Sequence, residues 1–179
     1  MILSLKKLIF RLLYRIWDVK QKRKLQKINS FDQVCVFDID NTLTISQLGK
    51  PVNHLSPIPR DGMINYVKEL INQGKKVIFL SARNFNLFDN TIDWLQHQGI
   101  FDKDKNELFL VHSSISKIEY LKKLIESNKA VLFIDDLSYN HENSNIKYYK
   151  ETEQEINKLN IEFKGLDFIS KLKNEPKKF

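Results

Sequence analysis

Four short apolar runs in the chain each end at a polar residue. The runs are VCVF before Asp38, VIFL before Ser81, LFLV before His112 and VLFI before Asp135. Runs of this length are typical of strands that are buried on both faces of a sheet. Residues 61–73, 86–98 and 116–126 lie between the runs and space apolar residues three or four apart, which predicts helices. The alternation predicts an α/β fold with a doubly wound, mainly parallel sheet.

Further signals extend this pattern and fix one helix start. We expect a fifth strand at residues 146–149 and a last helix at residues 166–172. Ser116 and Glu119 have the spacing of a capping box, in which both side chains bond backbone N–H groups of the first turn. This box places Lys117 at the first helical position, near the edge of the sheet where the strands end.

The composition fits one compact domain without disulfides. The 179 residues are 42% hydrophobic and 11% aromatic, which argues against a disordered chain. The single cysteine, Cys35, lies inside an apolar run, so we expect a buried thiol and a reducing compartment such as the cytoplasm. Four histidines are too far apart for ligand spacing and are assigned no chemistry; they are His54, His97, His112 and His141.

The net charge of +7 is concentrated at the N-terminus. Residues 1–29 contain nine Lys or Arg against Asp18 alone, which gives +8, and the remaining 20 basic and 21 acidic residues give −1. We therefore divide the chain into a basic N-terminal helix, residues 1–29, and a main domain, residues 30–179. A nearly neutral main domain argues against a broad nucleic-acid-binding face.

Residues 2–19 form an amphipathic helical pattern. Charged residues, including Lys7, Arg11 and Arg15, lie on one stripe, and leucines and isoleucines lie opposite. These charges interrupt any run near the roughly 20 apolar residues that span a bilayer. One interpretation is an anchor on an anionic membrane surface, which makes the protein peripheral; the other is docking on its own body or on a twin subunit. Because every predicted strand and helix described above, apart from this one, follows residue 33, we expect a chain that begins near Ser30 to stay folded.

The ends of the strands gather carboxylates. The carboxyl ends of parallel strands meet at one crevice, which brings Asp38, Ser81 and Asp135 together. Asp40 and Asp136 follow closely, so four carboxylates crowd this edge. Two carboxylates about 4 Å apart repel by roughly 4 kcal/mol at an effective dielectric constant near 20, so four of them need a metal ion or protons to neutralise them. Oxygen ligands of this kind favour Mg²⁺.

The sequence Asp38-Ile39-Asp40-Asn41-Thr42 resembles motif I of the haloacid dehalogenase (HAD) superfamily. The other three motifs follow in order: Ser81 is similar to motif II, Lys117 to motif III, and Asp135-Asp136 to the acidic motif IV. The resemblance covers about residues 33–150 and implies a Rossmann-like phosphatase fold of about five strands. Asn41 stands where the family often has glycine, and asparagine tolerates a left-handed backbone better than most residues.

The resemblance implies a covalent mechanism. Asp38 attacks phosphorus and forms an aspartyl-phosphate. Asp40 acts as the general acid and base, and its backbone carbonyl binds the metal. The implied metal ligands are Asp38, Asp40, Asp135 and Asp136. Within the last pair we favour Asp136 as the ligand and Asp135 as the partner of Lys117, although the reverse assignment is open.

The resemblance also implies residues that contact the substrate. Thr42 and Ser81 are assigned to substrate binding, and Lys117 offsets the charge of the phosphoryl group. Arg83 stands where polynucleotide phosphatases and lipin-type lipid phosphatases of the superfamily also have arginine, so it is assigned as a clamp on substrate phosphate; the alternative is a surface residue.

The chain has no room for the cap domain of HAD enzymes that act on small metabolites. Residues 43–60 contain three prolines and predict a short flap. Residues 83–117 are long enough only for the one helix and one strand predicted there. A capless site is open and suits a bulky or membrane-associated phosphomonoester, unless the enzyme closes its site by forming oligomers. The alternatives are a polynucleotide-end phosphatase and a catalytically silent binding protein at a membrane surface.

Overall fold

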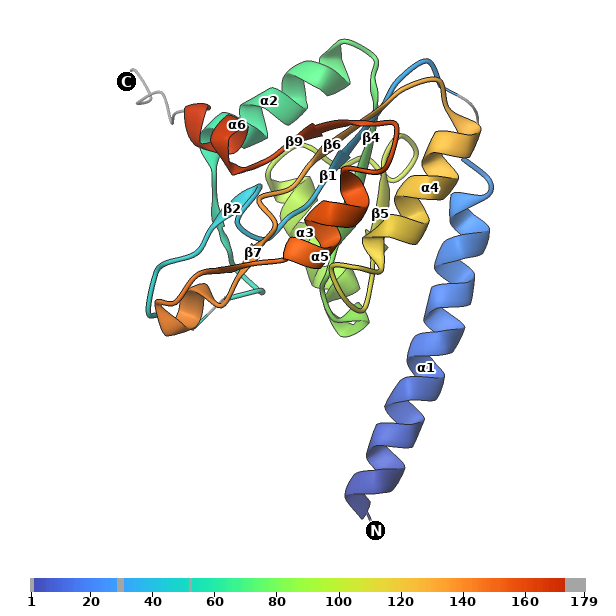
Figure 1. The fold of residues 1–179 in the computed structure, drawn as a ribbon, viewed down its shortest axis with the longest axis vertical. Coiled ribbons are helices and arrows are strands. Elements are labelled where there is room, and N and C mark those ends of the chain that lie inside the picture. Colours follow the sequence, from blue (N-terminus) through green and yellow to red (C-terminus); the bar gives the residue numbers. More distant parts are fainter. Residues whose placement is uncertain (1, 29–30, 52, 173–179) are drawn as a thin grey trace.

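The computed structural model describes residues 2–28, 31–51 and 53–172 and has a five-stranded parallel sheet at its centre (Figure 1). The strands lie in the order β5-β4-β1-β6-β9, and every adjacent pair is parallel. Their bounds are β1 Val34–Phe37, β4 Lys76–Ser81, β5 Glu107–Leu110, β6 Val131–Ile134 and β9 Glu162–Lys164. From β1 the chain continues first to β4 and β5 on one side and then to β6 and β9 on the other. This reversal makes the carboxyl end of β1 the switch point where a ligand crevice is expected.

Helices cover both faces of the sheet. They are α2 Asp61–Asn72, α3 Phe88–His97 after a 3₁₀ turn at Phe85–Leu87, α4 Lys117–Ser127, α5 Lys150–Ile156 and α6 Leu166–Lys171. Cys35 and Phe37 of β1 pack with α2, α3 and α6, whereas Val34 and Val36 pack with α4 and α5 on the other face. Burial on both faces explains why the strand sequences are unbroken apolar runs. The predicted α/β fold is confirmed.

One strand prediction is wrong. Residues 146–149 do not add a fifth strand to the central sheet, because β8 Lys147–Tyr148 pairs antiparallel with β7 Ser138–Tyr139 in a separate hairpin. The fifth strand is β9, whose sequence EFK is only partly buried at the edge of the sheet. An edge strand with polar residues at both ends lacks the apolar run on which the prediction relied.

The predicted flap is a second small hairpin. It pairs β2 Thr44–Ile45 with β3 Ile58–Pro59. Asn41 leads into it with a φ of 61°, the left-handed conformation that asparagine was expected to tolerate here. Lys117 begins α4 as predicted, but Ser116 makes no capping bond and pairs with Ser113 instead, so the capping box does not form.

Helix α1, Ile2–Leu25, packs partly on the body and partly projects past it (Figure 1). Leu25 and the following Ile28 are buried in the core on the α4 face of the sheet. Removing residues 1–29 would uncover that core, so the structure argues against the expectation that a chain beginning near Ser30 stays folded. Among the described residues, no helix is both long and apolar enough to cross a membrane.

Candidate active site

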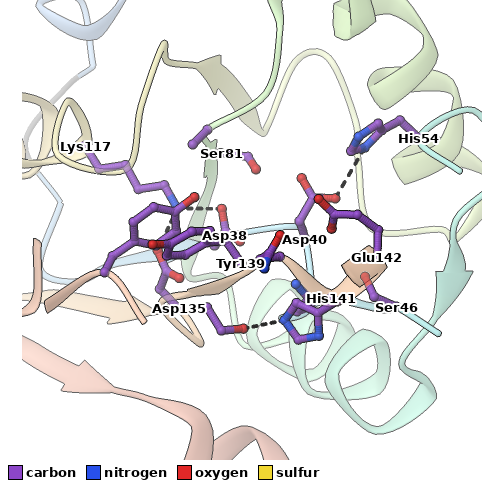
Figure 2. Close-up of a pocket in the computed structure, with 15 residues that line it drawn as sticks. Asp38, Asp40, Ser46, His54, Ser81, Lys117, Asp135, Tyr139, His141 and Glu142 are labelled. Carbon is purple, nitrogen blue, oxygen red and sulfur yellow. Dashed lines mark hydrogen bonds and ion pairs between the residues drawn. The ribbon is translucent and has the colours of Figure 1, made fainter. Parts of the chain in front are cut away.

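Asp38 occupies the switch point directly after β1. Its backbone N–H donates to the carbonyl of Ile134 at 2.9 Å, which continues the parallel ladder and fixes the position of the side chain. The first side chain of α4 reaches across: Lys117 Nζ donates to Asp38 Oδ1 and to Asp135 Oδ2, each at 2.6 Å (Figure 2). All three side chains are nearly fully buried. The predicted pairing of Lys117 with Asp135 is confirmed, and the ammonium also contacts the proposed nucleophile.

Asp38, Asp135 and Asp136 form a buried acidic cluster, in which one ligand oxygen from each lies within 4.8 Å of the others. Burial is the main cause that raises the pKa of Asp38 and of Asp136, and neighbouring carboxylates raise it further. Burial lowers the pKa of Lys117, but Asp135 and Asp38 outweigh it, so this pKa is raised and the lysine stays charged. When all three are ionised, the three carboxylates and the ammonium of Lys117 leave two net negative charges, and the ligand atoms are oxygens only. The cluster therefore fits a divalent cation such as Mg²⁺.

Thr42 supports this cluster and does not face the cavity. Its hydroxyl donates to Asp136 Oδ1 at 3.2 Å and accepts from the backbone N–H of Asp136 at 3.1 Å. The residue is completely buried, and Ser138 holds the other oxygen of Asp136. The structure thus places Thr42 behind the acidic cluster, which corrects its assignment to substrate binding.

Asp40 points toward the cavity and is held from behind by Arg83. The guanidinium donates through Nε to Oδ2 at 2.8 Å and through Nη2 to Oδ1 at 2.7 Å. Burial opposes ionisation of Asp40, but the charge and hydrogen bonds of Arg83 outweigh it, so the pKa of Asp40 lies below its usual range. The Arg83 side chain is 1% exposed and also bonds Thr91, whereas Asp40 is 27% exposed. Arg83 therefore orients Asp40, which corrects its assignment as a clamp on substrate phosphate.

We predict that Arg83→Met strands the Asp40 carboxylate and lowers the free energy of unfolding. The expected loss is about 3 kcal/mol, the low end for a broken buried ion pair, because Asp40 is partly exposed. Urea unfolding measures it. The double variant Arg83→Met/Asp40→Asn removes the stranded charge and should recover part of the stability. A single variant as stable as the unmodified chain would show that the pair contributes little.

Ser81 ends β4 beside the acidic cluster and lines the same cavity. The residue is 1% exposed, and its hydroxyl has no hydrogen-bond partner among the described residues. A buried hydroxyl without a partner costs free energy, so its position at the cavity favours a ligand that accepts its hydrogen bond. A phosphoryl oxygen fits the role predicted for Ser81.

The cavity has a volume of about 310 Å³ and is walled by the two small hairpins (Figure 2). His54 comes from the β2–β3 hairpin, and Tyr139 and His141 come from the β7–β8 hairpin. The hairpins also touch each other, because the N–H of Gly49 donates to the carbonyl of His141 at 3.0 Å.

The sequence analysis missed these wall residues. It assigned the histidines no chemistry, yet His54 Nδ1 lies 3.6 Å from Asp40 Oδ1, and His141 Nε2 lies 2.7 Å from the Ser138 hydroxyl that contacts Asp136. No spacing in the sequence connects residue 54 with residue 141. The available signal was position, since His54 lies in the predicted flap and His141 follows motif IV within a few residues.

The fold and the site define a phosphatase of the HAD type, with no cap domain among the described residues. Residues 35–161 match the family model of the LNS2 domain of PITM 1-3, and the chain belongs to this LNS2 domain family. Among solved structures, the class C acid phosphatase from Bacillus anthracis is similar, with 21% identity over 83% of this chain and 71% of that chain and a TM-score of 0.47. A comparison with curated proteins gave no match.

Proposed function

We propose that this chain is a Mg²⁺-dependent phosphomonoester phosphatase that works through a phosphate ester on Asp38. The observation that carries the proposal is the buried cluster of Asp38, Asp135 and Asp136, with Lys117 as its one ammonium partner. The ionised cluster keeps two net negative charges after pairing with Lys117, which is costly in a buried site unless a cation neutralises them. The same arrangement argues against a catalytically silent binding protein.

Asp38 is the nucleophile in the first half of the reaction. One of its oxygens forms a bond to phosphorus, and the bond from phosphorus to the leaving oxygen breaks. Asp40 supplies the proton that the leaving oxygen takes up. In the second half, Asp40 accepts a proton from water, and the hydroxide oxygen attacks phosphorus, which releases phosphate and restores the Asp38 carboxylate.

The ion pair with Arg83 suits Asp40 better as the base that accepts a proton from water than as the acid that protonates the leaving oxygen. A lowered pKa keeps Asp40 ionised, as a base requires, whereas an acid must be protonated when the substrate arrives. A phosphate dianion bound between Asp38 and Asp40 would raise the pKa of Asp40, because like charges disfavour ionisation. Substrate binding itself would thus prepare Asp40 as the acid.

The remaining groups bind and orient the phosphoryl group. Ser81 donates its unpaired hydroxyl to a phosphoryl oxygen, and Lys117 holds the attacking carboxylate and offsets the developing charge. Asp38, Asp135 and Asp136 would hold the Mg²⁺, with the backbone carbonyl of Asp40 as the further ligand. When bound, the ion neutralises the cluster and polarises the phosphoryl oxygens.

The walls of the cavity favour a bulky or membrane-associated substrate. Besides the strand ends and Lys117, two short hairpins border the cleft among the described residues, and no cap domain among those residues covers it, so a large leaving group can extend outward past the hairpins. A polynucleotide substrate gains no support from this surface. Within the described lining, Lys117 is the sole lysine or arginine, and two carboxylates already hold it, so no basic track is available for a nucleic-acid backbone.

We predict that a chelator removes hydrolysis of p-nitrophenyl phosphate and that added Mg²⁺ restores it. The rate should fall by at least about 100-fold, because a bound metal lowers the activation barrier by several kcal/mol and the chelator removes that contribution. Release of nitrophenolate measures the rate, and chelator saturated with Mg²⁺ beforehand is the control. Full turnover in free chelator would mean that protons neutralise the cluster, and the metal part of the proposal would then be abandoned.

A further inference from the structure

The outward face of α1 is apolar and has no partner among the described residues. Its members project from successive turns with 49% to 64% of their surface exposed. They are Leu8, Ile9, Leu12, Leu13, Ile16 and Val19. We call these six residues the α1 outer face. A continuous exposed apolar strip on a helix marks an interaction surface, because isolated exposed leucines are common but a full face is not.

The opposite side of α1 is docked on the body, so the direction of the outer face is fixed. Trp17 Nε1 donates to the carbonyl of Leu110 at 3.3 Å, and the Tyr14 hydroxyl accepts from the N–H of His112 at 2.7 Å. The Trp17 and Phe85 rings stack with centroids 5.9 Å apart. The two interpretations of the N-terminal helix are therefore compatible: one side docks on the body, and the other side remains available.

The charges around the outer face have one sign. Arg15, Lys20 and Arg23 are exposed on α1, and Lys27 is exposed just after its end. The one acidic residue of the helix, Asp18, turns inward to Lys22 at 2.8 Å and to the Tyr120 hydroxyl at 3.2 Å. A second copy docked on this face would bring its own basic residues against these, whereas an anionic surface would complement them.

We infer that the α1 outer face docks on an anionic lipid bilayer, with the apolar side chains in the interfacial layer and the basic residues at the headgroups. An amphipathic helix that lies in the plane of the interface needs this combination of an apolar face and a basic border. Helix α1 runs along the sheet, so that residues nearer its N-terminus contact the carboxyl ends of the strands. Lys24 contacts Glu107 at the start of β5, and Trp17 contacts Leu110 at its end. Phe10 contacts Phe85, which follows the end of β4. Figure 1 shows that α1 projects past the end of the sheet where these strands finish, and the cleft is lined by residues at the same strand ends.

The test compares the full chain with Leu12→Gln/Ile16→Gln in cosedimentation with vesicles. One vesicle preparation is phosphatidylcholine alone, and the other contains phosphatidylserine as one third of the lipid. We expect the full chain to bind the mixed vesicles, to bind less at high salt, and to lose affinity by about tenfold or more in the double variant. Leu166→Gln, which changes an exposed leucine on α6, is the matched control and should bind like the unmodified chain.

Urea unfolding, which needs no measurement of turnover, checks that the variants are folded. The test is therefore independent of the proposed chemistry. Absence of binding to the mixed vesicles by the folded full chain would overturn the inference. Equal binding by the full chain and the double variant would also overturn it. A dimer in sedimentation equilibrium that the double variant dissociates would assign the face to a second copy instead.

Discussion

Replacing Asp38 by asparagine should abolish turnover of an aryl phosphate while the protein stays folded. The carboxamide has nearly the same shape but cannot act as the nucleophile, so the rate should fall by at least about 10⁴-fold. Lys117 keeps Asp135 as its ion-pair partner at 2.6 Å, so the ammonium is not stranded. Removal of one of three crowded carboxylates also reduces repulsion, so we expect the free energy of unfolding to stay the same or to rise.

Steady-state hydrolysis of p-nitrophenyl phosphate and urea unfolding measure the two parts of this expectation. Asp32→Asn is the matched control, because Asp32 is an exposed aspartate that pairs with Lys129 far from the site and should change neither quantity. Acid quenching during turnover should recover substrate phosphate covalently on residue 38 of the unmodified chain. Retained turnover in Asp38→Asn would exclude Asp38 as the nucleophile.

The sequence was sufficient for the residues whose position follows from the sheet. Asp38, Ser81 and Asp135 each follow a run of four apolar residues in a strand, and parallel pairing brings the ends of such strands to one edge by geometry alone. The predicted start of α4 at Lys117 is also correct, although the capping box from which it was predicted does not form. The charge argument for a cation likewise required only that the carboxylates meet.

What the sequence did not predict depends on the direction in which side chains point and on loop contacts. The types and order of Thr42 and Arg83 match the family pattern, but nothing in their spacing shows that one turns to Asp136 and the other to Asp40. His54 and His141 reach the site from hairpins that a contact at Gly49 joins, and long-range contacts between short loops leave no periodic pattern. The periodicity of α1 predicted an apolar face. It did not show that the aromatic residues Tyr14 and Trp17 would contact the body while the leucines and isoleucines stay exposed.

Replacing Asp40 by asparagine should slow turnover by an amount that depends on the leaving group. General acid and base catalysis contributes about 10² to 10⁴ to the rate, and an asparagine supplies neither function. Nitrophenolate needs little protonation as it departs, whereas an alkoxide needs much. We therefore expect a loss for an alkyl phosphate that exceeds the loss for p-nitrophenyl phosphate by about tenfold or more.

The control for this comparison is Ser81→Ala, which removes a donor to the phosphoryl group and leaves Asp40 with Arg83. Because the phosphoryl group is the same in both substrates, Ser81→Ala should slow both by the same factor. Released inorganic phosphate, measured for both substrates in both variants, gives four ratios. If Asp40→Asn slowed the two substrates equally, Asp40 would not protonate the leaving oxygen. Its position beside Asp38 would then serve only the second step, in which the attacking group is water whatever the leaving group was.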